Sequence, residues 1–406
     1  MENNKVLIKK IDANINEWLT EQKNATDFLQ NSGKKDFNQN DILNIATSSF
    51  ISNKIGECFR EFSNDYSRIY FSPLVKNIVS KIEECTAELH FFYIDNLERF
   101  SNLDVKPEYK INDKLEETPQ IQPFIDSFMN SYAFKIDKAN SAIEKNNLVL
   151  IKITDRQSNL ENKTEYIFDS EGEKDPFHKE LDVALEGAKV GSHVEINIEN
   201  KEYGVDVIRV REVKNMPITD ENATLIGVPE IQNREDAKKF IISTVVEQLF
   251  NKELHNYALS IYESLINKID ISEDEPKELI DSEIDRRLHD FISQFKIENK
   301  QIQMSDKEFE EIKKQHYDQF KSQTSKAFKM NFIRSWLPRS LKITLVDGEI
   351  EKEYRTLMSM TTEKDRDTMN INPQKIAEVL IDRKVAKHYL LQNNPDLYEK
   401  YNYNKK

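Results

Sequence analysis

The chain of 406 residues has little glycine, little cysteine and no long apolar run. Its two cysteines, Cys58 and Cys85, match neither a zinc-ligand spacing nor a CxxC motif, so we expect two reduced, buried thiols. No segment approaches the ~20 apolar residues that span a bilayer, and the first ten residues lack the apolar region of a signal peptide. The sequence therefore predicts a cytoplasmic protein without membrane contact.

Motifs that carry common chemistries are also missing. The sequence contains no Walker loop, GxSxG, GxGxxG or HExxH, and its seven histidines are scattered. We therefore expect no cofactor and no metal site. The formal net charge of -14 argues against a general DNA or RNA binder, because binding to phosphates needs clustered Lys and Arg. A local basic tip could still contact RNA.

The few glycines indicate a β-rich middle region. Five of the eight lie between positions 172 and 227, where apolar and polar residues alternate as in strands. Ile151 and Ile153 face one way along the first strand, and the alternation shifts between Val207 and Ile208, as a bulge requires. Residues 149–214 therefore predict a small antiparallel sheet domain.

Helices are predicted for the remainder of the C-terminal region, residues 215–406. A third helix in this region is expected to end at Pro338. Four helix starts carry residues that stabilise a first turn: Asn233 with Asp236, Pro276, Ser305 with Glu308 in a capping box, and Asn372 followed by Pro373.

The N-terminal region mixes both kinds of element. KVLIKKI and ELHFFYI are typical of strands, and two amphipathic helices lie between them. Residues 1–114 therefore predict an α+β domain, and residues 115–148 a connector that turns into a helix. The expected fold class is α+β multidomain, because the chain is too long for one ordinary core.

The third C-terminal helix carries more apolar area than a thin, charged region readily buries. One interpretation is packing against neighbouring helices. The other is a partly open surface that binds unfolded segments without sequence choice. The candidate client-binding residues are Phe309, Phe320, Phe328, Phe332 and Trp336.

Four stretches resemble the trigger factor family of ribosome-associated bacterial chaperones. PKELIDSEIDRR (276–287) is similar to the start of that family's second C-terminal helix, and EVKNMPITDENATLIGV (212–228) to the segment that leads into its helical arms. LEGAKVGSHVEINI (185–198) resembles a turn and strand of its FKBP-like domain, and ELHFFYIDNLE (88–98) the strand closing its N-terminal domain. The resemblance covers nearly the whole chain in order.

This resemblance implies a ribosome-binding domain at 1–114, an FKBP-like domain at 149–214 and an all-α C-terminal chaperone domain with arms at 215–406. The connector at 115–148 would belong to the C-terminal domain. The implied function is ATP-independent holding of nascent chains near the ribosomal exit tunnel, in protein folding and transport. The implied partners are ribosomal protein, rRNA and unfolded polypeptides, and a weak homodimer is left open.

The loop NSGKKDF is the counterpart of the family's ribosome-docking loop. Gly33 and Lys34 match the family pattern, Lys35 adds charge, Phe28 can supply the aromatic, and the family's Arg and Pro are missing. Gly33 gives the turn access to positive φ, and the lysines can meet acidic side chains or phosphate. An ordinary polar turn with solvated lysines is the alternative interpretation.

The isomerase motif of the family has been replaced here. Where the family has an Asp-aromatic pair, this chain has Lys152-Ile153. Where the family has a Pro-Gly-aromatic motif, this chain has Lys179-Glu180-Leu181. A remnant pocket would use Tyr166, Phe168, Phe177 and Leu181. Isomerisation relies on a dry aromatic cavity, so we expect weak or lost activity. The alternatives are an active peptidyl-prolyl isomerase, and a scaffold protein that has lost ribosome binding.

Overall fold

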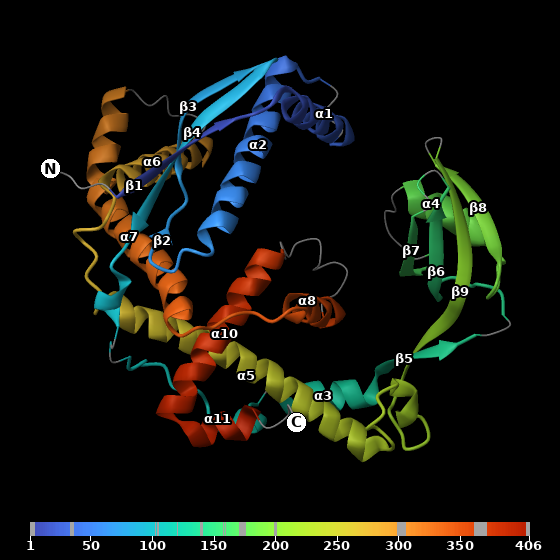
Figure 1. The fold of residues 1–406 in the computed structure, drawn as a ribbon. Coiled ribbons are helices and arrows are strands. Elements are labelled where there is room, and N and C mark those ends of the chain that lie inside the picture. The colour runs from blue at the N-terminus through green and yellow to red at the C-terminus, as the bar shows by residue number, and fades with distance from the viewer. Residues whose placement is uncertain are drawn as a thin grey trace. The chain divides into compact units, whose positions relative to one another are not determined.

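The chain folds into two compact units. In the computed structural model, unit 1 combines Met1–Ile111 with Glu253–Lys406, and unit 2 is Asn112–Lys252. The structure describes residues 5–32, 36–101, 103, 105–119, 121–138, 141–156, 158, 160–169, 176–198, 201–298, 306–360 and 372–402. The predicted mixed α+β fold is confirmed (Figure 1). The predicted four-part domain division stays a prediction.

The N-terminal part of unit 1 is a sheet with two helices on one face. Its elements are β1 (Val6–Asp12), α1 (Ile15–Asn31), α2 (Gln39–Phe62), β2 (Ile69–Tyr70), β3 (Leu74–Lys81), β4 (Glu84–Ile94) and the 3₁₀ turn η1 (Leu97–Phe100). β4 lies between β1 and β3 and pairs antiparallel with both. Trp18 is fully buried, and its Nε1 donates to the carbonyl oxygen of Lys81 at 2.7 Å. This bond joins α1 to the end of β3.

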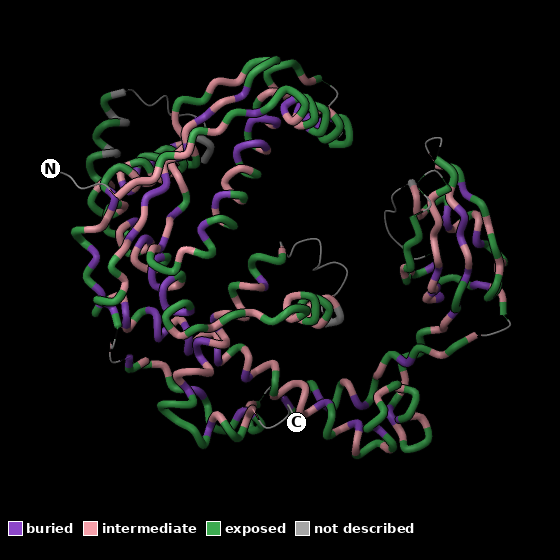
Figure 2. Tube along the Cα trace, viewed as in Figure 1, coloured by how far each residue is buried: buried purple, intermediate pink, exposed green. Residues whose placement is uncertain are grey.

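The core of this part lies between the helices and the sheet, where Figure 2 colours one side of α2 and the facing strands as buried. Phe50 on α2 meets Trp18 edge to face at 6.4 Å. Cys58 and Cys85 are free and buried in the same core, as predicted, and burial raises the pKa of both thiols. The cysteines therefore serve as small hydrophobic side chains.

The C-terminal part of unit 1 is helical. The helices are α5 (Arg234–Ile266), α6 (Lys277–Glu298), α7 (Asp306–Ser340), α8 (Glu349–Met360), α10 (Pro373–Asn393) and α11 (Pro395–Asn402). Two predicted caps are confirmed by hydrogen bonds: Asp236 N donates to Asn233 Oδ1 at 2.9 Å, and Lys375 N to Asn372 Oδ1 at 2.8 Å. Ser305, the predicted cap of α7, lies outside the described residues.

The predicted end of α7 at Pro338 is wrong by two residues. The helix continues to Ser340 with Pro338 inside its last turn. A proline lacks only its own N–H, and the carbonyl oxygen of Pro338 still accepts a 2.8 Å bond from the backbone N of Ile343. The last turn is therefore closed by bonds that do not need the missing donor.

Aromatic side chains pack α7 against the N-terminal part of unit 1. Phe71, after β2, stacks on Phe328 with ring centroids 4.1 Å apart. Phe100 in η1 meets Phe332 at 5.0 Å and Trp336 at 5.9 Å. All of these rings are buried, so the packing holds the two sequence-distant parts of unit 1 together.

Charged contacts add to this interface within unit 1. Asp274, between α5 and α6, has a side chain only 7% exposed and pairs with Lys5 at 3.2 Å and with Arg99. Lys76 on β3 pairs with Glu278 on α6. Removal of a partner from such a buried carboxylate costs more free energy than breaking an exposed ion pair.

Unit 2 contains a five-stranded antiparallel sheet. Its elements are η2 (Leu115–Glu117), α3 (Ile121–Asn130), β5 (Tyr132–Asp137), β6 (Leu148–Asp155), β7 (Glu161–Ile167), α4 (Pro176–Leu185), β8 (His193–Ile198), β9 (Lys201–Met216) and η3 (Ala223–Ile226), followed by the first part of α5. The strand order is β5-β9-β6-β7, with β8 also paired to β9.

The predicted irregularity in the last strand is confirmed. Leu150 faces Arg209 and Ile151 faces Val207, so Ile208 is the extra residue of a bulge. The sequence did not predict β5, which lies in the expected connector and pairs with the second half of β9. One core under the sheet contains Val149, Leu181 and Leu185, among other residues of β6, α4, β8 and β9.

Candidate functional site

The structure positions the predicted docking loop between two packed helices. α1 ends at Asn31, and α2 begins at Gln39 with a capping box in which Asn38 and Asp41 bond each other's backbone. Lys54 on α2 pairs with Glu17 on α1 at 2.9 Å. The end of α1 and the start of α2 therefore flank this stretch in the chain, and an ion pair links the two helices.

Phe28 lies in the last turns of α1 with 62% of its surface exposed. It is accessible to a partner, in agreement with its predicted role, which stays a prediction. Gly33, Lys34 and Lys35 lie outside the described residues.

The four predicted remnant-pocket residues of unit 2 share one core. Phe168 and Leu181 are buried within it, and Tyr166 and Phe177 pack partly buried against it. Phe177 meets Tyr203 edge to face at 5.5 Å. The Tyr166 hydroxyl is buried and has no hydrogen-bond partner among the described residues, and burial, with the nearby charge of Asp182, raises its pKa. These side chains fill the space beneath the sheet.

Lys152 and Ile153 lie on opposite faces of the sheet. Ile153 packs partly buried against the core, and Lys152 points to the opposite face of the sheet, where its Nζ lies 3.2 Å from Glu161 Oε1 and 3.3 Å from Asp206 Oδ2. These two carboxylates raise the pKa of Lys152, with Glu161 the stronger cause. Lys152 therefore belongs to a charged surface.

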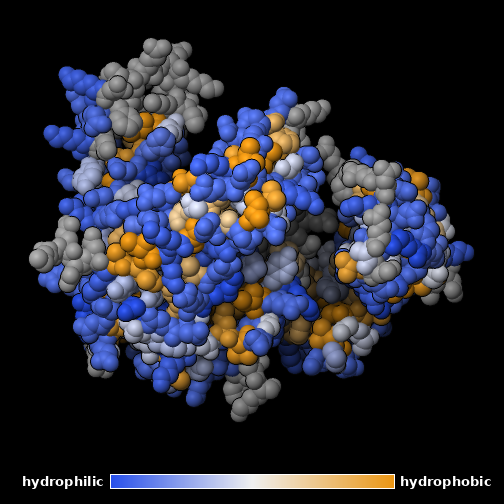
Figure 3. All heavy atoms as spheres, turned by 45° about the horizontal axis from the view of Figure 1, so that its top comes forward, coloured by the Kyte–Doolittle hydropathy of each residue, from blue (hydrophilic) through white to orange (hydrophobic). Residues whose placement is uncertain are grey.

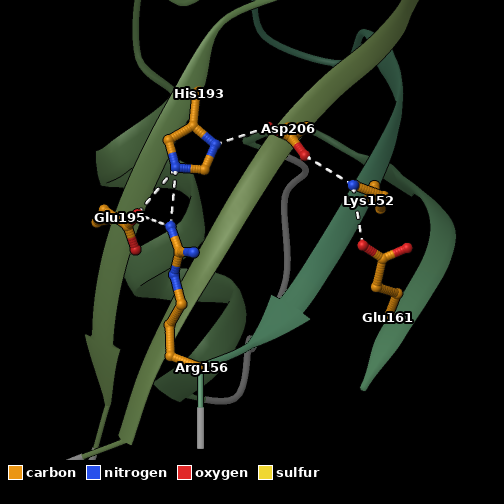
Figure 4. Close-up of polar contacts among 6 residues, drawn as sticks. All are labelled: Lys152, Arg156, Glu161, His193, Glu195 and Asp206. Atoms are coloured by element: carbon orange, nitrogen blue, oxygen red, sulfur yellow. Dashed lines mark hydrogen bonds and ion pairs between the residues drawn. The ribbon is translucent and has the colours of Figure 1, made fainter. Parts of the chain in front are cut away.

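A row of charged side chains crosses this outer face of the sheet (Figure 4). His193 Nε2 lies 2.9 Å from Glu195 Oε1, and His193 Nδ1 lies 2.6 Å from Asp206 Oδ1. Arg156 pairs with Glu195. Glu195, then Asp206, raises the pKa of His193 by favouring the imidazolium form. The row links four strands through their side chains, with all its members at least partly exposed.

The absence of a side chain at Gly204 leaves space for this row of charged residues. A Cβ at Gly204 would come within 3.1 Å of both Arg156 Nη2 and His193 Cε1. The guanidinium and the imidazole therefore lie directly over the backbone of β9. Sequence reasoning missed the row, although His193 and Glu195 at alternate positions of β8 were a usable signal.

The structure separates the predicted client-binding residues of α7. Phe328, Phe332 and Trp336 are buried in the aromatic packing with Phe71 and Phe100, so these three rings cannot reach a client in this arrangement. Phe320 is half-buried and meets Phe291 on α6 at 5.9 Å. The Phe309 side chain lies outside the described part of the chain.

A cavity of about 630 Å³ lies within unit 1 beside the same part of α7. Aromatic and aliphatic side chains (Phe59, Tyr70, Phe71, Ile381) form part of its lining, and polar residues of α7 and α10 form the rest. Such a mixed lining can bury apolar side chains of a bound chain and hydrogen-bond its backbone. This cavity is one concave site of unit 1 that could contact a client, beside a larger one of about 1130 Å³ between Tyr109 and α5.

A buried polar network closes one wall of the cavity. Asp382 on α10 is 4% exposed at its side chain, and it accepts 2.7 Å and 2.6 Å hydrogen bonds from Tyr262 Oη and Arg334 Nη2. Burial, then the charge of Asp382, raises the pKa of Tyr262. The network ties α5, α7 and α10 together at one point.

The surface offers further apolar contacts. Figure 3 shows a mostly hydrophilic face with separate hydrophobic patches.

Within the described part of the chain, no group of three or more His, Cys, Asp or Glu side chains could hold a metal ion. No helix in that part is long and apolar enough to cross a bilayer.

Comparison with known proteins identifies the helical region. The family model described as bacterial trigger factor protein (TF) C-terminus matches residues 235–392, from α5 through nearly all of α10. This stretch is similar to the C-terminal region of trigger factor. The family resemblance predicted from the sequence is thereby confirmed for these residues, and the cavity and the Asp382 network lie largely on helices that the family model covers.

A solved structure gives a weaker likeness. It is described as "Promiscuous Substrate Recognition in Folding and Assembly Activities of the Trigger Factor Chaperone". Its sequence is 20% identical, the match covers 97% of this chain and 98% of that chain, and the TM-score is 0.28. With so low a TM-score, this match supports no conclusion about the protein. Curated proteins gave no match.

Proposed function

We propose that this protein is an ATP-independent chaperone that holds unfolded nascent chains and docks near the ribosomal exit tunnel. The observation that carries the proposal is the match of residues 235–392 to the family model of the trigger factor C-terminus. The mixed lining of the 630 Å³ cavity supports client contact at this domain. Among the predicted client residues, Phe320 keeps an accessible surface.

Suppression of aggregation tests the holding activity. The protein should slow aggregation of a chemically denatured client without ATP. Ile381→Asp places a charge in the cavity lining and should weaken this effect, whereas Leu391→Asp, at an exposed position of the same helix outside the lining, should not. Equal activity of both folded variants would exclude the cavity as a client site.

Cosedimentation tests ribosome docking. Exposure of Phe28 beside the basic loop supports this part of the proposal. Replacing Lys34 and Lys35 together by alanine should abolish cosedimentation at low salt, and Phe28→Ala should weaken it. Wild-type binding by the double variant would rule out the loop as the contact, including contact with rRNA.

We further propose that isomerase activity is weak or lost. Phe168 and Leu181 are buried in the core of unit 2, and Lys152 lies on the charged outer face of its sheet. A proline-limited refolding assay should show no acceleration at protein concentrations that suppress aggregation. Clear catalysis would favour the enzyme alternative, and the absence of both ribosome binding and holding would favour the scaffold alternative.

A further inference from the structure

The outer edge of β1 is open for strand pairing. β1 pairs with β4 in one unbroken register from Val6–Phe92 to Asp12–Thr86, and β3 occupies the other side of β4. Ala13 N bonds Cys85 O, and Tyr93 N bonds Lys5 O, so odd-numbered residues of β1 direct their backbone groups towards β4. The even-numbered residues therefore direct theirs away from it.

These outward groups have no partner in the described part of the chain. Val6, Ile8, Lys10 and Asp12 take part in no backbone hydrogen bond on that side. Ile8 is 47% exposed and the Lys10 side chain 81% exposed, so the edge is reachable. Four residues thus present four N–H and four C=O groups in the regular spacing of an unpaired strand.

Two other edge strands, β3 and β7, carry more protection than β1, whose exposed charged side chains are those of Lys10 and Asp12. β3 has a register shift between Lys76 and Val79, with Asn77 at a φ of 52°. Such a bulge interrupts pairing with a further strand. β7 carries exposed charged side chains along its length. In β1, by contrast, Lys9 is turned inward to Glu61 at 3.0 Å.

We propose that β1 captures an extended segment of an unfolded polypeptide by strand addition. This inference rests on the proposed holding function and names one place where a client binds. Main-chain hydrogen bonds give affinity without sequence choice, and neighbouring side chains add a mild preference. Opposite Ile8 that preference is for β-branched residues, and Lys10, which already pairs with Glu88 of β4 at 3.3 Å, adds a weaker preference for an acidic residue.

A second copy of this chain fits the edge less well. Symmetric pairing that uses all four outward residues places Val6 opposite Asp12 and Ile8 opposite Lys10. It then places Lys9 opposite Lys9, and like charges directly opposite each other destabilise a strand pair. The net charge of -14 on each copy adds repulsion.

Single-residue hydrogen exchange tests the proposal with the full chain. The probe is an eight-residue peptide of alternating valine and threonine with one glutamate, and its control is the same peptide with alternate amides N-methylated. The first peptide should slow exchange at Ile8, Lys10 and Asp12, and the methylated one should not. Unchanged exchange with the first peptide would overturn the inference.

Two variants separate the backbone from the side chain. Ile8→Pro removes an outward N–H without removing a bond to β4, and should weaken peptide binding about five- to tenfold. Ile8→Thr keeps the N–H and should bind as wild type. Equal binding by both folded variants would overturn strand addition, as would protection that grows with protein concentration without peptide.

Failure here is distinguishable from failure of the proposed function. Aggregation suppression that persists when β1 shows no protection would overturn strand addition alone. Loss of aggregation suppression in the wild-type protein would instead remove the proposed holding function.

Discussion

At the scale of single residues, Asp382 is the most constrained charged group in unit 1. Its carboxylate is almost fully buried and accepts hydrogen bonds from a tyrosine on α5 and an arginine on α7. His255 Nδ1 lies 3.6 Å away as a third neighbour. Removal of one partner from such a group leaves the others unsatisfied, which costs more than the loss of an exposed pair.

Asp382→Asn should therefore destabilise unit 1 by about 2 kcal/mol, because Arg334 loses its counter-charge and Tyr262 keeps only an amide partner. Denaturant unfolding measures the change. Glu378→Gln is the matched control, since Glu378 is exposed on the same helix. A difference below about 0.5 kcal/mol between these variants would show that the network adds nothing to stability.

His193 links unit 2 to pH. Its folded pKa is raised above 6.5, so its contribution to stability is fully present below the unfolded pKa and is lost as pH rises through the folded value. The same contacts lower the pKa of Glu195 and Asp206, whose contributions are lost as pH falls through those lowered values. This part of the sheet is therefore best stabilised at mildly acidic pH.

An NMR titration of the His193 ring measures this effect directly. The wild-type pKa should lie above 6.5, and Asp206→Asn should lower it, because one of two carboxylates that favour the imidazolium is removed. Glu186→Gln, at an exposed position after α4, should leave the His193 pKa unchanged. A His193 pKa at or below 6.5 in the wild type would contradict the ion pairs.

The sequence predicted local features well and distant contacts poorly. Asn233, Asn372 and the bulge at Ile208 were predictable because caps and alternation depend on neighbouring residues. β5 was missed because its six residues are too few to show a clear alternation of apolar and polar side chains. Its partner strand, β9, also lies far along the chain. The burial of Phe332 was undecidable from the sequence, since its covering ring, Phe100, is distant in sequence.

At the scale of elements, α7 joins parts of unit 1 that are far apart in sequence. One of its faces carries rings that stack on residues after β2 and in η1, and another carries Arg334 in the Asp382 network. α6 packs beside its first half, where Phe291 meets Phe320. The same helix therefore changes from a core element near its end to a half-exposed element near its start.

Phe332→Ala tests this division along α7. Phe332 is fully buried, so its truncation should lower the free energy of unfolding by about 3–5 kcal/mol. Phe320→Ala should cost clearly less, because that side chain is only half-buried. Denaturant unfolding of both variants gives the comparison, and equal losses would contradict the packing described here.

At the scale of the whole molecule, the chain divides into two units with separate cores. Unit 2 is continuous in sequence, whereas unit 1 is assembled from both ends of the chain. α5 belongs to both units, with the boundary between Lys252 and Glu253. Units with their own cores often unfold as separate cooperative transitions.

Calorimetry should accordingly show two transitions. Asp382→Asn should lower only the transition of unit 1, and Val207→Ala, a truncation in the core of the sheet, should lower only that of unit 2. A single transition shifted equally by both variants would mean that α5 couples the units into one cooperative block.

The discontinuity of unit 1 has a consequence for how the protein is made. Unit 2 is fully synthesised once Lys252 has left the ribosome, but the N-terminal sheet must wait for α7 to cover Phe71 and Phe100. At about 5–20 residues per second, synthesis of residues 253–340, up to the end of α7, takes roughly 4–18 seconds. During that interval the half-built protein exposes apolar surface, so the chain itself needs shelter while it is being made.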